Sequence, residues 1–261
     1  MSGALVLWVI ILISSLPIIA VYVWFHFAKY QFSLYRFLFA LLAGAAAFFP
    51  ALILQALLTF SFQDVRAAIF FQHFIRIALS EELSRFLLLL VFFLISNRIT
   101  RNSGQLSGSP QPSFDTIKKA TATGLVAGLG FALLESAVYA AADVRVLPLR
   151  IIITAAVHGA CGSRIGAAAV LLRTNPFQAI VRILTATAIH GIYNMLIIMP
   201  GFSPIAAILI AVSALFSAIV TIRGGWLGDM IENTPDPMPS SLTPDGPLPD
   251  MVDKKDNNSV N

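Results

Sequence analysis

Ionisable side chains interrupt a hydrophobic stretch near residue 80. Glu81, Glu82 and Arg85 lie inside an apolar run that extends from residue 70 to residue 95. A charged group is costly to place in the core of a bilayer, so such residues mark candidate functional sites. Glu81 and Arg85 are four residues apart, which places them on one helix face and lets them pair. Glu82 projects about 100° away and is predicted to serve another neighbour or a cavity.

Other apolar stretches carry single residues of the types that hydrolytic sites use. They are Glu135, His158, His190 and Asn194. At about 1.5 Å per residue from the outer end of each expected span, Glu81 lies roughly 17 Å deep. The glutamate and the two histidines of the other spans lie roughly 10 to 14 Å deep on the same scale. Four helices are therefore expected to place polar groups in one layer, in the outer half of the bilayer.

A pocket with carboxylates and imidazoles suits the hydrolysis of an amide bond. A carboxylate can take a proton from water, and an imidazole or the Asn194 amide can stabilise the developing oxyanion. Alternatively, His158 and His190 together with Glu81 or Glu135 hold a divalent metal such as zinc, which activates the water. The spacing is compatible with both mechanisms.

Each of these groups also has a purely structural interpretation. Glu81 and Arg85 can form a neutralised pair that fixes helix packing, and a lone glutamate, histidine or asparagine can bridge two helices. The glycines at 124, 128 and 130 favour close helix approach rather than chemistry. The structural interpretation of all the polar groups together requires five coincidences at one depth. We therefore favour a functional pocket.

The elements that must position these groups are membrane helices. The chain has 261 residues, of which 57% are hydrophobic and 11% are charged. Repeated apolar runs of about 20 residues are typical of transmembrane helices. We predict an all-α polytopic membrane protein with about seven such helices and the active-site pocket between helices 3 and 6. The expected spans are residues 5–25, 37–60, 70–95, 121–142, 151–172, 177–199 and a seventh that ends near residue 222.

Composition also predicts the domain boundaries and excludes several other kinds of site. Residues 1–230 are predicted to form the membrane domain, with a motif-bearing core at 70–199, and the Pro-, Asp- and Asn-rich residues 231–261 a disordered tail. The Gly-, Ser- and Pro-containing segment 97–120 is predicted to be a flexible basic loop. The single Cys161 excludes an intramolecular disulfide and a cysteine-built zinc site. No basic patch with interleaved aromatic residues indicates a nucleic-acid partner.

The distribution of loop Lys and Arg predicts the orientation. Cytoplasmic loops carry the excess of positive charge. The richer set of loops holds Lys29, Arg36, Arg98, Arg101, Lys118, Lys119, Arg173 and Arg223. The other set holds Arg66, Arg145 and Arg150, with Arg76 near the start of the third span. The N-terminus is therefore expected outside and the C-terminal tail in the cytoplasm.

Four short motifs, in order on four consecutive expected spans, resemble those of the PrsW family of intramembrane proteases. That family belongs to the wider superfamily of CAAX prenyl endopeptidases and bacteriocin-processing membrane proteins. The motifs are Glu81-Glu82-x-x-Arg85, Phe131-Ala-Leu-Leu-Glu135 with the glycines before it, His158, and His190-Gly-Ile-Tyr-Asn194. One departure is Arg85, where the family pattern usually has Lys, and the two are not equivalent at a buried pair.

The resemblance implies roles for these residues. Glu81 is implied as the water-activating carboxylate with Glu82 in support, His190 and Asn194 as the groups that bind the water or the oxyanion, and Glu135 and His158 as the rest of the pocket. Family members are described both as metalloproteases and as glutamate-dependent enzymes, so both mechanisms stay open. The implied substrate is a membrane-anchored protein or peptide, such as an anti-sigma factor cut near the outer face of a bacterial cytoplasmic membrane.

Two other classes of function stay open. The first is a catalytically silent scaffold, since a seven-span subunit of the gamma-secretase complex is similar to this superfamily. The retained glutamates, histidines and Asn194 argue against it. The second is a proton-coupled transporter, because carboxylates and histidines also form proton relays. The lack of an internal repeat speaks against transport. A retinal photoreceptor is excluded because no lysine lies inside an expected span.

Overall fold

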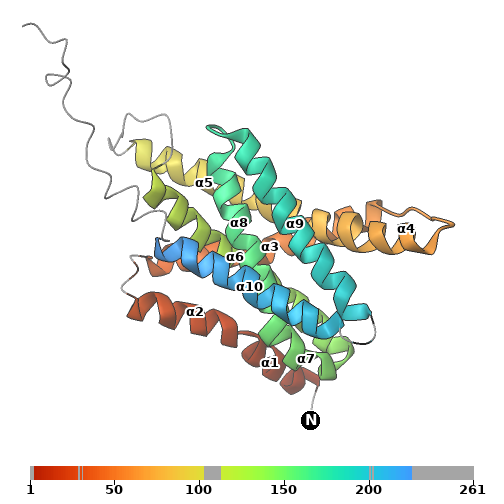
Figure 1. The fold of residues 1–261 in the computed structure, drawn as a ribbon. Helices are drawn as coiled ribbons and strands as arrows, with labels where there is room; N and C mark the ends of the chain where they lie inside the picture. Colours follow the sequence, from red (N-terminus) through yellow and green to blue (C-terminus); the bar gives the residue numbers. More distant parts are fainter. Residues whose placement is uncertain are drawn as a thin grey trace, which may run out of the picture. The chain divides into compact units, whose positions relative to one another are not determined.

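The computed structural model describes residues 3–28, 30, 32–102, 113–199, 201 and 203–224, and every regular element in these ranges is a helix (Figure 1). Of the predicted flexible loop at 97–120, residues 103–112 lie outside the described residues, and the predicted tail lies entirely outside them. The flanking parts of that loop are helical instead, since 97–102 belong to α5 and 114–120 to α6. The helices are α1 (Gly3–Ser14), α2 (Leu16–Phe27), α3 (Leu34–Leu57), α4 (Val65–Phe70), η1 (Phe71–Leu79), α5 (Ser80–Asn102), α6 (Phe114–Ala142), η2 (Val144–Val146), α7 (Leu147–Leu149), η3 (Arg150–Thr154), α8 (Ala155–Leu171), α9 (Pro176–Ile198) and α10 (Ser203–Arg223).

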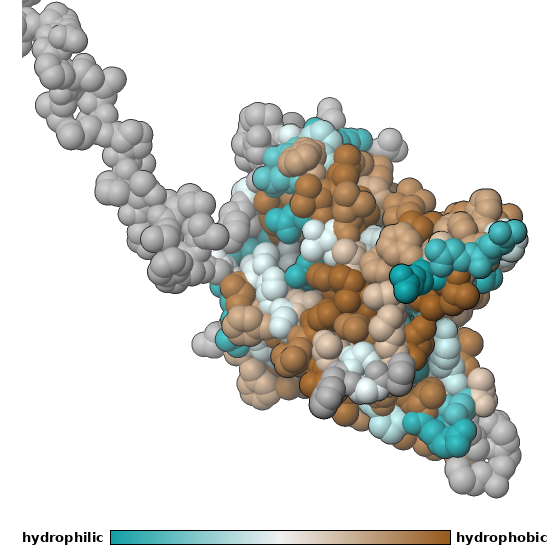
Figure 2. All heavy atoms as spheres, turned by 45° about the vertical axis from the view of Figure 1, so that its right-hand side comes forward, coloured by the Kyte–Doolittle hydropathy of each residue, from teal (hydrophilic) through white to brown (hydrophobic). Residues whose placement is uncertain are grey.

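The prediction of an all-α polytopic membrane protein is confirmed. Six helical segments among the described residues are long and apolar enough to cross a membrane: Trp8–Phe27, Leu34–Leu57, Asp115–Ala142, Val144–Leu171, Pro176–Ile198 and Ser203–Arg223. The expected third span corresponds to the run of α4, η1 and α5, which carries the glutamate pair and is helical without interruption from Val65 to Asn102. Figure 2 shows hydrophobic side chains over much of the visible face, as expected where helices meet lipid.

Several element boundaries differ from the expected ones for local reasons. The first span is divided at Ser15, because Pro17 in the first turn of α2 cannot continue the hydrogen-bond ladder of α1. Lys118 and Lys119 belong to α6 rather than to the loop before it. The expected connection at 143–150 is mostly helical and leads into α8 through η3. Arg150 is therefore part of a membrane helix.

Backbones approach closely where α6 crosses its neighbours. A Cβ atom added to Gly128 would meet the carbonyl oxygen of His158 on α8, and one on Gly130 would meet that of Leu41 on α3. Small residues allow such approach between membrane helices. The packing role predicted for these glycines is confirmed. Because His158 is at the contact with Gly128, this packing also sets its position.

Helix α8 is the centre of the described bundle. It packs against α5, α6, α9 and α10, and most of its residues are buried small side chains such as Ala160, Gly162 and Ala167. His158 on this helix is buried and therefore faces protein instead of lipid. Helices that carry the other polar motifs surround it, which makes α8 the element that brings them together.

Candidate active site

Buried ionisable side chains from four helices meet in the interior of the bundle. Each has at most 9% of its surface exposed. They are Glu81, Glu82 and Arg85 at the start of α5, Glu135 on α6, His158 on α8 and His190 on α9. The groups expected from the sequence to share one layer are thus in contact through hydrogen bonds and ion pairs.

One half of the cluster joins α5 to α9. His190 Nδ1 lies 2.9 Å from Glu82 Oε1, and Arg85 Nη2 lies 2.5 Å from the same oxygen. Arg85 also donates to the carbonyl oxygen of His158 at 3.3 Å and covers the ring of Phe131 with its guanidinium. The carboxylate of Glu82 is thereby held between a cation and an imidazole.

The pairing of Arg85 differs from the expected one. The four-residue spacing predicts Glu81 as its partner, but Glu81 Oε2 lies 3.9 Å from Arg85 Nη2, against 2.5 Å for Glu82 Oε1. Residues three apart on a helix are neighbours as well as residues four apart. The guanidinium turns towards Glu82 because it also reaches the His158 carbonyl on α8. This leaves Glu81 as the less engaged carboxylate.

The other half of the cluster joins α6 to α8. Glu135 Oε2 lies 2.7 Å from His158 Nε2 and 2.6 Å from Arg150 Nη2. The Arg150 guanidinium also lies over the ring of Tyr139, and its Cζ atom is 4.1 Å from the ring centroid. Arg150 was expected in an outer loop and was not predicted as a site residue. The π-helical turn η3 carries it into the bundle.

Three atoms of the cluster face one another without a hydrogen-bond partner of their own. Glu81 Oε1 accepts a hydrogen bond from Gln55 Nε2 at 3.1 Å, whereas Glu81 Oε2 accepts none. His158 Nδ1 is also buried without a partner. His190 contacts Glu82 through Nδ1, so its Nε2 atom is not used in that contact. This Nε2 atom lies 3.7 Å from Glu81 Oε2. Buried polar atoms without partners are costly, so their convergence indicates a bound group.

These residues fit a divalent metal ion. Glu81, His158 and His190 each offer one ligand atom, and the three atoms lie within 4.8 Å of one another. Two histidines and one carboxylate form a ligand set that catalytic zinc uses, with a fourth position for water or substrate. The second nitrogen of each imidazole contacts a carboxylate, as metal-ligating histidines commonly require. Of the two glutamates considered from the sequence, Glu81 is the one in this set.

Asn194 stands apart from the cluster. It is half-buried on α9, and its side chain makes none of the side-chain hydrogen bonds or ion pairs found among the described residues. Its neighbour Tyr193 is buried, and its hydroxyl lies 2.7 Å from Thr154 Oγ1 on η3.

Sequence reasoning missed Gln55, although a lone amide in an apolar span is a visible signal. The contact between Tyr193 and Thr154 has no comparable signal in the sequence.

Comparisons with known proteins agree with the motif pattern. A family model described as PrsW family intramembrane metalloprotease matches residues 33–221. The match covers all four motifs and both π-helical turns. Searches of curated proteins and of solved structures found no match.

Proposed function

The chain belongs to the PrsW family of intramembrane metalloproteases, and on this premise we propose that it hydrolyses a peptide bond of a membrane-anchored protein or peptide at the cluster around Glu81. Membership in the family and the apolar helices make the chain an integral, multi-pass membrane protein whose substrates are membrane-embedded. The observation that carries the specific site is the convergence of three ligand atoms from α5, α8 and α9.

The proposed metal ligands are Glu81, His158 and His190. A divalent ion, when bound, supplies an activated water and polarises the scissile carbonyl. The chain's own contribution is orientation. Glu82 and Glu135 hold the two imidazoles by their second nitrogens, and Arg85 and Arg150 hold those two carboxylates in turn. The burial of this arrangement limits competing water.

A glutamate-dependent form of the mechanism uses the same atoms. Glu81 Oε2 then takes a proton from the attacking water, while Gln55 fixes the other oxygen of that carboxylate. Asn194 is proposed to bind the oxyanion once a substrate is in place. The metal content of the purified protein and the effect of a chelator on cleavage distinguish the two forms.

We place the protein in a bacterial cytoplasmic membrane with its N-terminus outside and its C-terminus in the cytoplasm. The rule counts Lys and Arg residues whether or not an acidic partner lies nearby. The richer set of loops holds eight such residues and the other set four, counting Arg76, which supports this orientation. The proposed cleavage lies near the outer face, as for an anti-sigma factor.

The test begins with a comparison of membrane proteomes with and without the protein, which supplies candidate substrates. Glu81→Gln and Glu82→Gln are then assayed singly on such a substrate. Loss of the Glu81 carboxylate is expected to lower kcat by about 10²- to 10⁴-fold. Cleavage that survives both changes at normal expression contradicts the proposal. A stoichiometric partner without cleavage supports a scaffold, and liposome flux abolished by Glu135→Gln supports a transporter.

A further inference from the structure

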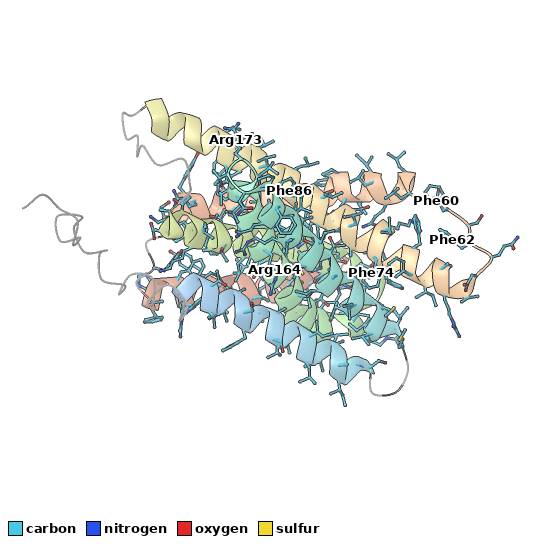
Figure 3. The ribbon with its side chains drawn as sticks, turned by 45° about the horizontal axis from the view of Figure 1, so that its top comes forward. Phe60, Phe62, Phe74, Phe86, Arg164 and Arg173 are labelled. Atoms are coloured by element: carbon cyan, nitrogen blue, oxygen red, sulfur yellow. The ribbon has the colours of Figure 1, made fainter. Side chains whose placement is uncertain are left out.

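A hairpin beside the active site forms an open cavity of its own. The hairpin (residues 55–76) runs from the end of α3 through α4 into η1, and Figure 1 shows it extending beyond the other helices. The cavity between its arms has a volume of about 410 Å³. Aromatic side chains line one part of it and polar side chains another; they include Phe60, Phe62, Phe71, Gln72, His73 and Arg76. Figure 3 shows Phe60 and Phe62 on this hairpin.

Arg76 is the charged residue of this cavity. It is half-buried, and its two hydrogen bonds go to neutral acceptors: Nε donates to the Gln55 carbonyl at 2.9 Å and Nη1 donates to Gln72 Oε1 at 3.1 Å. It forms no ion pair with any residue in the described ranges. A guanidinium has five N–H donors, so three remain available together with the full positive charge. Such a group suits a carboxylate, which it can bind in a bidentate manner.

The same arginine connects the cavity to the active site through one residue. Gln55 accepts from Arg76 with its carbonyl oxygen and donates from its side chain to Glu81 Oε1. The π-helix η1 also connects the two along the chain, because it begins at Phe71 of the cavity and ends at Leu79, two residues before Glu81. π-Helical turns often occur at functional sites. A peptide held in the cavity would therefore have its adjoining residues next to Glu81.

We infer that the hairpin cavity binds the segment of the substrate just outside the membrane, by pairing an aspartate or glutamate of that segment with Arg76. This inference rests on the proposed function, because it identifies the occupant as the protein to be cleaved. The aromatic rings accept an apolar side chain beside the acid. A lipid phosphate has similar charge, but the link through Gln55 to Glu81 favours the substrate.

The experiment uses single-span peptides in nanodiscs of phosphatidylcholine. Each peptide carries Asp, Asn or Lys at one position of its outer segment, and each position is tested in turn. Binding to the full-length protein is measured by fluorescence anisotropy, and cleavage is measured separately by mass spectrometry. At one position we expect the Asp peptide to bind about tenfold more tightly than its Asn counterpart, since a charge-assisted contact exceeds a neutral one.

Substitutions of Arg76 test whether this residue causes the preference for the Asp peptide. Arg76→Gln should remove it, Arg76→Lys should retain part of it, and Arg76→Glu should transfer it to the Lys peptide. Arg66→Gln is the matched control, because Arg66 is an exposed arginine of the same hairpin that does not line the cavity. A thermal melt of each variant checks that the fold is intact.

Three results would overturn the inference: equal binding of Asp and Asn peptides, a preference that survives Arg76→Gln in a folded variant, or a preference that disappears in phosphatidylglycerol nanodiscs. The last result would assign the cavity to the head group of an anionic lipid. If the preference for the Asp peptide depends on Arg76 but no peptide is cleaved, the result would contradict the proposed proteolysis and still support the binding site.

Discussion

His190 Nδ1 lies 2.9 Å from Glu82 Oε1, although the two residues are 108 positions apart in the sequence. This contact ties α9 to α5 and fixes the rotation of the imidazole about its axis. As a result Nε2 of His190 is the nitrogen on the side of Glu81. The contact between His158 and Glu135 does the same for the second imidazole. Two carboxylates thus orient two histidines, and the third carboxylate completes the set.

Removal of a metal should lower both activity and stability. A chelator is expected to abolish cleavage and to lower the melting temperature, since an ion at 100 times its Kd stabilises the folded state by about 2.7 kcal/mol. Elemental analysis should find about one zinc per chain. His158→Ala and His190→Ala should lose this metal, whereas His26→Ala, an exposed histidine outside the cluster, should keep it. Full activity in metal-free protein would favour the glutamate-dependent form.

Arg150 is expected to act through Glu135 and His158. Arg150→Gln removes the cation that holds Glu135 Oε2 at 2.6 Å, so the imidazole loses its fixed orientation. We expect metal affinity to fall about 10- to 100-fold, measured by competition with a chromophoric chelator. Arg145→Gln is the control, because among the described residues that exposed arginine pairs with Asp143 and not with the cluster. Unchanged affinity in Arg150→Gln would limit Arg150 to a packing role.

Gly128 should tolerate no side chain. In Gly128→Ala the new Cβ meets the carbonyl oxygen of His158, and backbone cannot yield as a flexible side chain can. The free energy of unfolding is expected to fall by about 1 to 3 kcal/mol. Gly159→Ala is the matched control one helix away, since its Cβ would find its nearest neighbour, a Leu129 side-chain atom, at 3.5 Å. Denaturation in detergent compares the two variants, and equal stability would contradict the close approach of α6 and α8.

Asn194 is expected to affect chemistry without affecting the metal. If its amide binds the oxyanion, Asn194→Ala should lower kcat by about 10²- to 10³-fold and leave KM and zinc content near those of the unaltered protein. His190→Ala, in contrast, should lower both kcat and zinc content. An unchanged kcat in Asn194→Ala would remove this residue from the proposed mechanism and restrict it to helix packing.

The sequence alone determined the class of the protein and most of the ionisable members of the cluster. Apolar runs near the thickness of a bilayer indicate spans, and an ionisable group inside such a run stands out because hydrocarbon solvates it poorly. The constant rise of a helix then relates position along the chain to depth, which is why Glu81, Glu135, His158 and His190 were expected in one layer. Depth depends little on how each helix is rotated.

The tertiary structure decided which atoms face one another. One residue along a helix turns a side chain by about 100°, so rotation cannot be obtained from depth. Here the close contacts of Gly128 and Gly130 set the rotation of α6 against α8 and α3. That packing directs Arg85 to Glu82 instead of Glu81, and the π-helical turn η3 brings Arg150 to Glu135. The sequence identified all the ionisable residues of the cluster except Arg150, and the packing of backbones paired them.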